Sequence, residues 1–181
     1  MSAKFAFLLL FISPLALAED CYTADASSGE VMFRVTQSGA PFTGTFRKFN
    51  GELCFDKGRL LRIEATLDPA SIDSGLPELD VILKDKEFFA VREFPRVRFS
   101  SSSAQSKGDT HTLRGTLEIK GVKRETDISL RTQGSGSKLM IAGNLTLDRL
   151  QYGVGTGEWS NTQWLGAEVQ LSVKAALTPR K

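Results

Sequence analysis

The sequence predicts an all-β fold, an antiparallel eight-stranded β-barrel with a short helical insertion around residues 70–89. Apolar and polar residues alternate with period two over most of the chain, which is typical of antiparallel strands with one buried and one solvated face. Turn signals separate the alternating runs. Closure into a barrel would also remove the exposed edges of so long a sheet. A β-sandwich is the alternative architecture.

The expected strands follow the alternating runs in chain order. They fall at 31–36, 42–47, 52–56, 62–67, 96–100, 112–119, 127–131, 139–147 and 168–175. Between the fourth and fifth runs the period changes, because Leu79, Ile82, Leu83 and Lys86 recur at three- and four-residue spacing. Pro95 prevents this helix from continuing.

The first 18 residues have the pattern of a cleaved secretory signal. Lys4 precedes an apolar run over 5–17, and small residues at 16 and 18 precede Glu19. The apolar run is shorter than the roughly 20 residues of a spanning helix, so we expect no stable membrane insertion. We therefore expect a periplasmic protein whose single domain covers 19–181.

Export would place the two cysteines in an oxidising compartment. Cys54 lies between the inward positions Leu53 and Phe55, so its side chain is expected to point to the outer face of the barrel. We predict a disulfide between Cys21 and Cys54, with two free thiols as the alternative.

Composition and motifs exclude several classes of function. The 181 residues carry a formal net charge of +2, which gives no electrostatic reason to expect nucleic-acid binding. Two cysteines and one histidine, His111, are too few for most metal centres, so no metal site is expected. His111 lies between two threonines and is interpreted as a solvated residue at a strand edge. Residues 153–157 are rich in glycine but no helical pattern follows them, so they are interpreted as a flexible turn rather than a phosphate loop.

Four sequence blocks resemble the YceI-like family, the polyisoprenoid-binding periplasmic proteins with a lipocalin-like barrel. Together they cover nearly all of the mature chain in order. They are Phe42-x-Gly44-x-Phe46-x-x-Phe49-x-Gly51-x-Leu53-x-Phe55-Asp56; Ser71-Ile72-Asp73-Ser74-Gly75 followed by Asp80, Leu83, Glu87-Phe88-Phe89, Phe94-Pro95 and Phe99; Gly115-Thr116-Leu117-Glu118-Ile119-Lys120-Gly121-Val122-Lys123; and Asp148-Arg149-Leu150-Gln151-Tyr152-Gly153-Val154-Gly155. Leu79 and Ile82 depart from the family pattern, in which a basic residue and often a histidine occupy these positions.

The resemblance implies that the barrel holds a long isoprenoid or quinone-type chain, for carriage or storage and without catalysis or a further cofactor. From periodicity alone, the inward apolar residues could instead simply fill the core. The alternatives are a binding module for another amphiphile, such as a fatty acid or amide, and an enzyme acting on a lipid. A dimer is possible. The expected ligand-binding residues are Val31, Phe33, Phe42, Phe46, Phe55, Ile63, Phe88, Phe89, Phe99, Leu117, Ile141, Leu145, Arg149, Tyr152, Val169 and Leu171.

Arg149 has the inward phase of the run that precedes it. A buried guanidinium needs partners, because arginine stays charged in proteins. Two interpretations remain open. Arg149 is held by an internal carboxylate or by backbone carbonyls where the strand ends, or it meets the polar head of the ligand with Tyr152 beside it.

Overall fold

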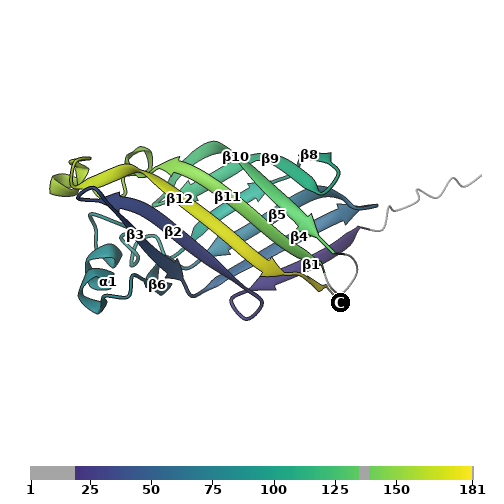
Figure 1. The fold of residues 1–181 in the computed structure, drawn as a ribbon, viewed down its shortest axis with the longest axis horizontal. Coiled ribbons are helices and arrows are strands. Elements are labelled where there is room, and N and C mark those ends of the chain that lie inside the picture. The colour runs from purple at the N-terminus through teal and green to yellow at the C-terminus, as the bar shows by residue number, and fades with distance from the viewer. Residues whose placement is uncertain (1–18, 135–138, 181) are drawn as a thin grey trace, which may run out of the picture.

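The computed structural model describes residues 19–134 and 139–180, and the expected signal segment 1–18 lies outside them. The described chain forms an antiparallel sheet of thirteen strands that curls into a barrel (Figure 1). The strands are β1 (Asp20–Asp25), β2 (Gly29–Gln37), β3 (Ala40–Phe46), β4 (Phe49–Asp56), β5 (Arg59–Leu67), β6 (Ile72–Asp73), β7 (Val97–Ser101), β8 (Ala104–Lys107), β9 (Thr110–Ile119), β10 (Val122–Gln133), β11 (Met140–Asp148), β12 (Leu165–Ala176) and β13 (Thr178–Pro179).

The antiparallel all-β barrel and its helical insertion are confirmed, but the count of eight strands is too low. Strands β6, β8 and β13 have two to four residues, which is too short for period two to register. The insertion consists of the 3-10 helix η1 (Pro69–Ser71) and the helix α1 (Pro77–Lys84). Pro77 occupies the first turn of α1, where its missing N–H costs no hydrogen bond.

The sheet closes on itself at one end only. The hydrogen-bonded order is β13-β1-β4-β5-β7-β9-β10-β11-β12-β2-β3-β6, and β8 pairs with β9. Strand β13 directly follows β12 along the chain and pairs with β1, so the sheet returns to its starting strand at this end. At the other end the path stops at β6, and α1 with the residues after it lies beside this edge (Figure 1). We call these the closed end and the open end.

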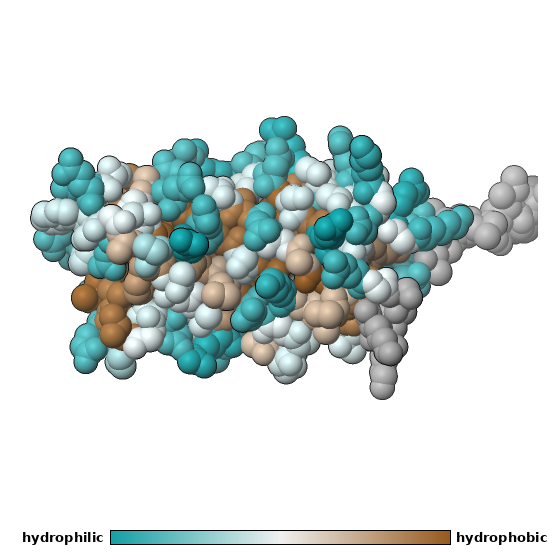
Figure 2. Space-filling view, in the orientation of Figure 1, coloured by the Kyte–Doolittle hydropathy of each residue, from teal (hydrophilic) through white to brown (hydrophobic). Residues whose placement is uncertain are grey.

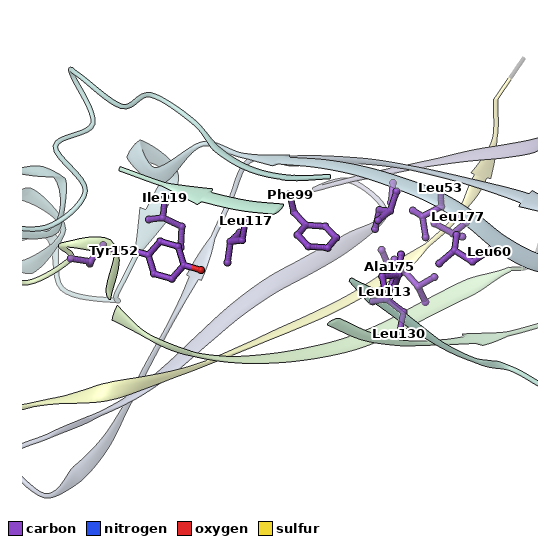
Figure 3. Packing of buried hydrophobic residues seen from close by; sticks show 14 of the residues in the cluster. Leu53, Leu60, Phe99, Leu113, Leu117, Ile119, Leu130, Tyr152, Ala175 and Leu177 are labelled. Carbon is purple, nitrogen blue, oxygen red and sulfur yellow. The ribbon is translucent and has the colours of Figure 1, made fainter. Parts of the chain in front are cut away.

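The closed end of the barrel is filled by side chains. Leu53, Leu60, Leu113 and Leu177 are almost fully buried there, and Figure 3 shows them gathered at one end of the interior. Ile119 and Tyr152 lie toward the opposite end of the same cluster (Figure 3).

The predicted disulfide is present in the structure. Cys21 of β1 and Cys54 of β4 are directly opposite each other in the register and are bonded. Arg62 lies beside them, with a guanidinium nitrogen 3.8 Å from the Cys21 sulfur and 3.1 Å from a Glu52 carboxylate oxygen. Cys54 is 0% exposed; the bonded Cys21 and the Glu52 carboxylate, 3.7 Å from the Cys54 sulfur, lie against it.

His111 is buried, and the interpretation as a solvated residue is wrong. Strand β8 pairs with β9, and Ser106 lies opposite His111 in the register. The two imidazole nitrogens lie 2.8 Å from the Ser106 hydroxyl and 3.0 Å from the Thr132 hydroxyl. The imidazole also meets the edge of the Phe55 ring. His111 has the inward phase of Leu113, Leu117 and Ile119 in the same strand, so its burial follows from the alternation.

Replacing both Cys21 and Cys54 by serine should lower the free energy of unfolding by about 3–4 kcal/mol, because the bridge closes a loop with a sequence separation of 33. Chemical denaturation with and without reductant measures this. Reductant should destabilise the wild-type protein and leave the double variant unchanged. Equal stability of the two oxidised proteins would contradict the prediction.

Stability should also depend on His111. Burial lowers the pKa of this imidazole below its ordinary 6.5, against the smaller opposite effect of the Asp109 charge. The unfolded chain therefore takes up a proton that the folded chain resists, so the contribution of His111 to stability is full above pH 6.5 and is lost as the pH drops below it. The test is to measure the free energy of unfolding in urea at about three pH values between 7.5 and 5, for the wild-type protein and for His111→Gln. The variant should have the flatter profile, and identical profiles would contradict the assignment.

Candidate ligand-binding cavity

An apolar cavity of about 120 Å³ lies in the interior at the open end of the barrel. Strands β2, β3 and β12 form one wall, and α1 with the residues after it covers the mouth. The segment between β11 and β12 and single residues of β5, β6, β7, β9 and β11 form the remaining side. The lining consists of Phe33, Val35, Gln37, Phe42, Phe46, Leu67, Ile72, Leu79, Leu83, Phe88, Phe89, Val97, Ile119, Leu147, Arg149, Tyr152, Val154, Trp159, Leu165, Val169 and Leu171.

The structure brings more than half of the predicted ligand-binding residues to this cavity. Those in its lining are Phe33, Phe42, Phe46, Phe88, Phe89, Arg149, Tyr152, Val169 and Leu171. Another five, Phe55, Ile63, Phe99, Leu117 and Ile141, lie in the packed core outside the lining. Val31 packs against the small cluster of Phe33, Phe46 and Ile72. Leu145 packs against the core and borders a depression between β2, β3, β11 and β12.

The difference arises because alternation gives the direction of a side chain and not its depth along the barrel. The same rule explains most of the lining residues that were missing from the prediction, since Val35, Val97 and Leu147 have inward phase. Leu79 and Leu83 of α1 could have been chosen from their four-residue spacing. Val154, Trp159 and Leu165 carry no periodic signal.

The aromatic residues on the β2–β3 wall form a connected cluster. The ring centroid of Phe33 lies 6.0 Å from that of Phe42 and 5.6 Å from that of Phe46. Phe46 in turn meets Phe89 edge to face at 5.9 Å, which is within the range of favourable aromatic pairs. Gly44 makes room for this cluster, because a Cβ there would lie 2.5 Å from the Phe33 ring. The glycine between Phe42 and Phe46 is therefore a packing requirement.

Arg149 has backbone partners for each of its five N–H groups. It is 3% exposed and belongs to the 3-10 helix η3 (Arg149–Tyr152). Its donors reach backbone oxygens at 2.6–2.8 Å, namely those of Val154, Gly155, Trp159, Leu165 and Gly166. Burial lowers the pKa of the guanidinium, with a smaller opposite contribution from Asp148. The side chain remains charged, and the interpretation with backbone carbonyls agrees with this geometry.

These bonds fold the segment between β11 and β12 around one side chain. The segment includes the 3-10 helix η4 (Gly157–Ser160) and carries Val154 and Trp159 into the cavity lining, next to Leu165 at the start of β12. Gly155 has a φ of +74°, and any Cβ at this position would overlap the Arg149 guanidinium. Residues 153–157, interpreted as a flexible turn, are therefore an ordered part of the cavity wall.

Two further sets of hydrogen bonds join the residues after α1 to the segment between β11 and β12. The carbonyl oxygen of Glu87, just after α1, accepts from the backbone N–H groups of Gly155 and Thr156 at 2.8 and 3.0 Å. The Lys120 ammonium donates to the carbonyl oxygens of Lys86 and Gly153 at 2.6 and 2.7 Å. We call these bonds the mouth latch. Burial lowers the pKa of Lys120, and the charges of Glu93 and Glu87 oppose this effect.

The polar groups that remain in the lining are neutral. The Tyr152 hydroxyl lies 3.4 Å from the Thr126 hydroxyl, and Gln37 contributes a half-buried amide. Within the described part of the chain, the lining contains no carboxylate, histidine, serine or cysteine. The site can thus enclose apolar groups and offer hydrogen bonds from a hydroxyl and an amide.

Glu19, Cys21 and Cys54 lie close enough to suggest a metal site. Both sulfurs belong to the disulfide, so they supply no thiolate for a metal. In the described ranges, no helix is both long and apolar enough to cross a membrane.

Comparison with known proteins gives consistent matches. The model of the YceI-like domain matches residues 22–177. Protein YceI of Salmonella agona (strain SL483) is 29% identical over 135 residues, which cover 73% of this chain and 71% of the relative. Protein YceI of Salmonella arizonae is 30% identical over 133 residues, or 71% of this chain and 69% of the relative.

Two solved structures share the fold. Burkholderia cenocepacia BcnA superposes with a TM-score of 0.79 at 27% identity, over 85% of this chain and 98% of that one. A polyisoprenoid binding domain from Saccharophagus degradans superposes with a TM-score of 0.71 at 13% identity, over 90% of this chain and all of that one.

Arg149→Met should be strongly destabilised, because it leaves five backbone oxygens without their donor at a cost of roughly 1–3 kcal/mol for each one that stays buried. Chemical denaturation measures the loss, and Arg34→Met, which removes an exposed arginine from β2, is the matched control. A folded Arg149→Met protein of wild-type stability with weakened ligand binding would instead support the role in binding the head group.

Proposed function

This chain belongs to the YceI-like domain family, and from that premise we propose that it binds the apolar chain of an uncharged isoprenoid or quinone-type lipid in the cavity. We further propose that it carries or stores this lipid in the periplasm. The signal-like pattern over residues 1–18 and the disulfide support that compartment.

The observation that carries the proposal is an apolar cavity in which the one charged side chain of the described lining already has hydrogen-bond partners for all of its N–H groups. Within the described residues, Arg149 is the only charged residue of the lining, and each of its N–H groups has a carbonyl partner. A carboxylate or phosphate inside the cavity would lack a free cationic partner and would be costly to desolvate. The lining therefore favours a neutral head group, which Gln37 and Tyr152 could contact.

The cavity is too small for a whole lipid chain, so binding requires some lining residues to move. A cavity of about 150 Å³ holds one benzene molecule, so about 120 Å³ accommodates only a small part of a long lipid. A longer chain has to displace lining residues. Leu79, Leu83 and Phe89 belong to the cover of the mouth rather than to the paired strands, so they can move with the least loss of sheet hydrogen bonds.

A fatty acid or amide is the second candidate ligand. An amide would meet the same neutral groups, whereas a fatty acid would need its carboxylate outside the cavity. Binding is favoured over catalysis on a lipid, since the described lining offers no paired base and nucleophile.

The test is to purify the exported full chain, extract it with organic solvent and identify the released molecules by mass spectrometry. An uncharged prenyl lipid or quinone supports the proposal. A fatty acid as the main released molecule would favour the second candidate. Absence of any apolar molecule, together with no binding of an added isoprenoid quinone, would overturn it.

Enlarging a lining residue should weaken binding. Val169→Phe adds a ring to the β12 wall and should reduce affinity for an added isoprenoid quinone at least about tenfold, which corresponds to about 1.4 kcal/mol. Fluorescence titration measures affinity, and unfolding checks the fold of the variant. Gln170→Phe, at the next and outward position of the same strand, is the matched control and should bind as the wild type does. Equal affinity in both variants would place the ligand elsewhere.

A further inference from the structure

Exposed apolar side chains gather at the open end of the barrel. In the described part of the chain the large exposed ones are Leu76, Val81, Ile82, Val122, Met140 and Trp164. Leu76, Val81 and Ile82 belong to α1 or its cap. The others at this end are Val122 and Trp164, while Met140 starts β11 near the closed end.

Hydrogen bonds place Val122 and Trp164 at the open end. The turn before Val122 contains Lys120, which bonds to the mouth-latch carbonyls of Lys86 and Gly153. The Trp164 carbonyl accepts from the backbone N–H of Ser38, in the turn that follows the cavity residue Gln37.

Helix α1 is apolar on two sides. Leu79 and Leu83 face the cavity, whereas Val81 and Ile82 are 69% and 40% exposed and Leu76 is 54% exposed. Figure 2 shows a cluster of hydrophobic residues on the surface where Figure 1 places α1. A helix that is apolar on both sides is normally buried on both sides. The described chain covers the side of α1 with Leu79 and Leu83 and leaves the side with Val81 and Ile82 exposed.

The surroundings of this face carry almost balanced charge. Residues 76–96 contain five acidic and four basic side chains. A strongly anionic or cationic partner would find no complementary field here. A zwitterionic lipid surface fits this balance, and Trp164 is the kind of side chain that favours the boundary between water and lipid.

The area of the face also argues against a stable protein partner. A stable protein–protein interface takes roughly 800 Å² from each partner, whereas this face consists of three partly exposed side chains on a helix of eight residues. Shallow, reversible contact with a bilayer needs no minimum area, since each side chain gains by entering the acyl region.

We propose that the outer face of α1, formed by Leu76, Val81 and Ile82, docks on the surface of a zwitterionic lipid bilayer. This inference rests on the proposed function, because it assigns the place where the bound lipid is taken up and released. Docking brings the cover of the cavity against the acyl chains. A lipid chain then passes from the bilayer into the cavity alongside one helix, without its apolar part crossing water.

The test uses the full mature chain and phosphatidylcholine vesicles in a flotation assay. The wild-type protein should float with the vesicles, and the double variant V81S/I82S should lose at least about tenfold in partition coefficient. The matched control is Met140→Ser, which removes an exposed apolar side chain near the closed end and should float as the wild type does. About 1 M salt, where screening acts within about 3 Å, should change the wild-type value less than twofold.

A second measurement separates this inference from the proposed function. The double variant should bind an isoprenoid quinone added from ethanol with wild-type affinity, yet take it up from quinone-loaded vesicles at least tenfold more slowly. If the wild-type protein floats with the vesicles but does not bind quinone, the result contradicts the proposed function and still supports the docking surface. Quinone binding without flotation would overturn the docking. A dimer that V81S/I82S converts to monomer would also overturn it, since a second copy would then cover the face.

Discussion

The architecture follows from a sheet that closes by hydrogen bonds at one end only. Strand β13 returns to β1 at the closed end, so that end can be filled by leucines from neighbouring strands. At the other end the path stops at the two-residue strand β6. Something other than a strand has to cover the interior there, and α1 together with the segment between β11 and β12 does so. The cavity is the space these two covers leave.

The two covers are joined mainly through backbone atoms. Arg149 gathers three carbonyl oxygens of its own segment and two from the start of β12, and the Glu87 carbonyl accepts two N–H groups from the same segment. Irregular backbone near an apolar interior must find partners for its polar groups. One buried cation meets this need for an entire segment, and so the wall can be ordered without regular secondary structure.

The fold was readable from the sequence because period two records which face of each strand is buried. The site was readable only in part. Phe33 and Phe99 share the same inward phase, yet one lines the cavity and the other lies in the packed core outside the lining. The position of a side chain along the barrel, from the closed end to the open end, depends on where strand pairing ends. No local sequence pattern records that position. Trp159 was invisible because it belongs to no periodic run. The burial of His111 was readable, because His111 extends the inward positions Leu113, Leu117 and Ile119 of β9 by one step.

The backbone character of the mouth latch has an evolutionary consequence. The groups that join residues 86–87 to residues 153–156 are mostly main-chain atoms; among the described residues, the side chains of Lys120 and Thr156 also contribute. Main-chain atoms are present whatever the side chains are. Residues such as Leu79, Leu83 and Phe89, which touch the cavity from the cover, can therefore be exchanged without loss of the atoms that close it. Selection can then change the shape of the cavity without removing the main-chain bonds of the mouth latch.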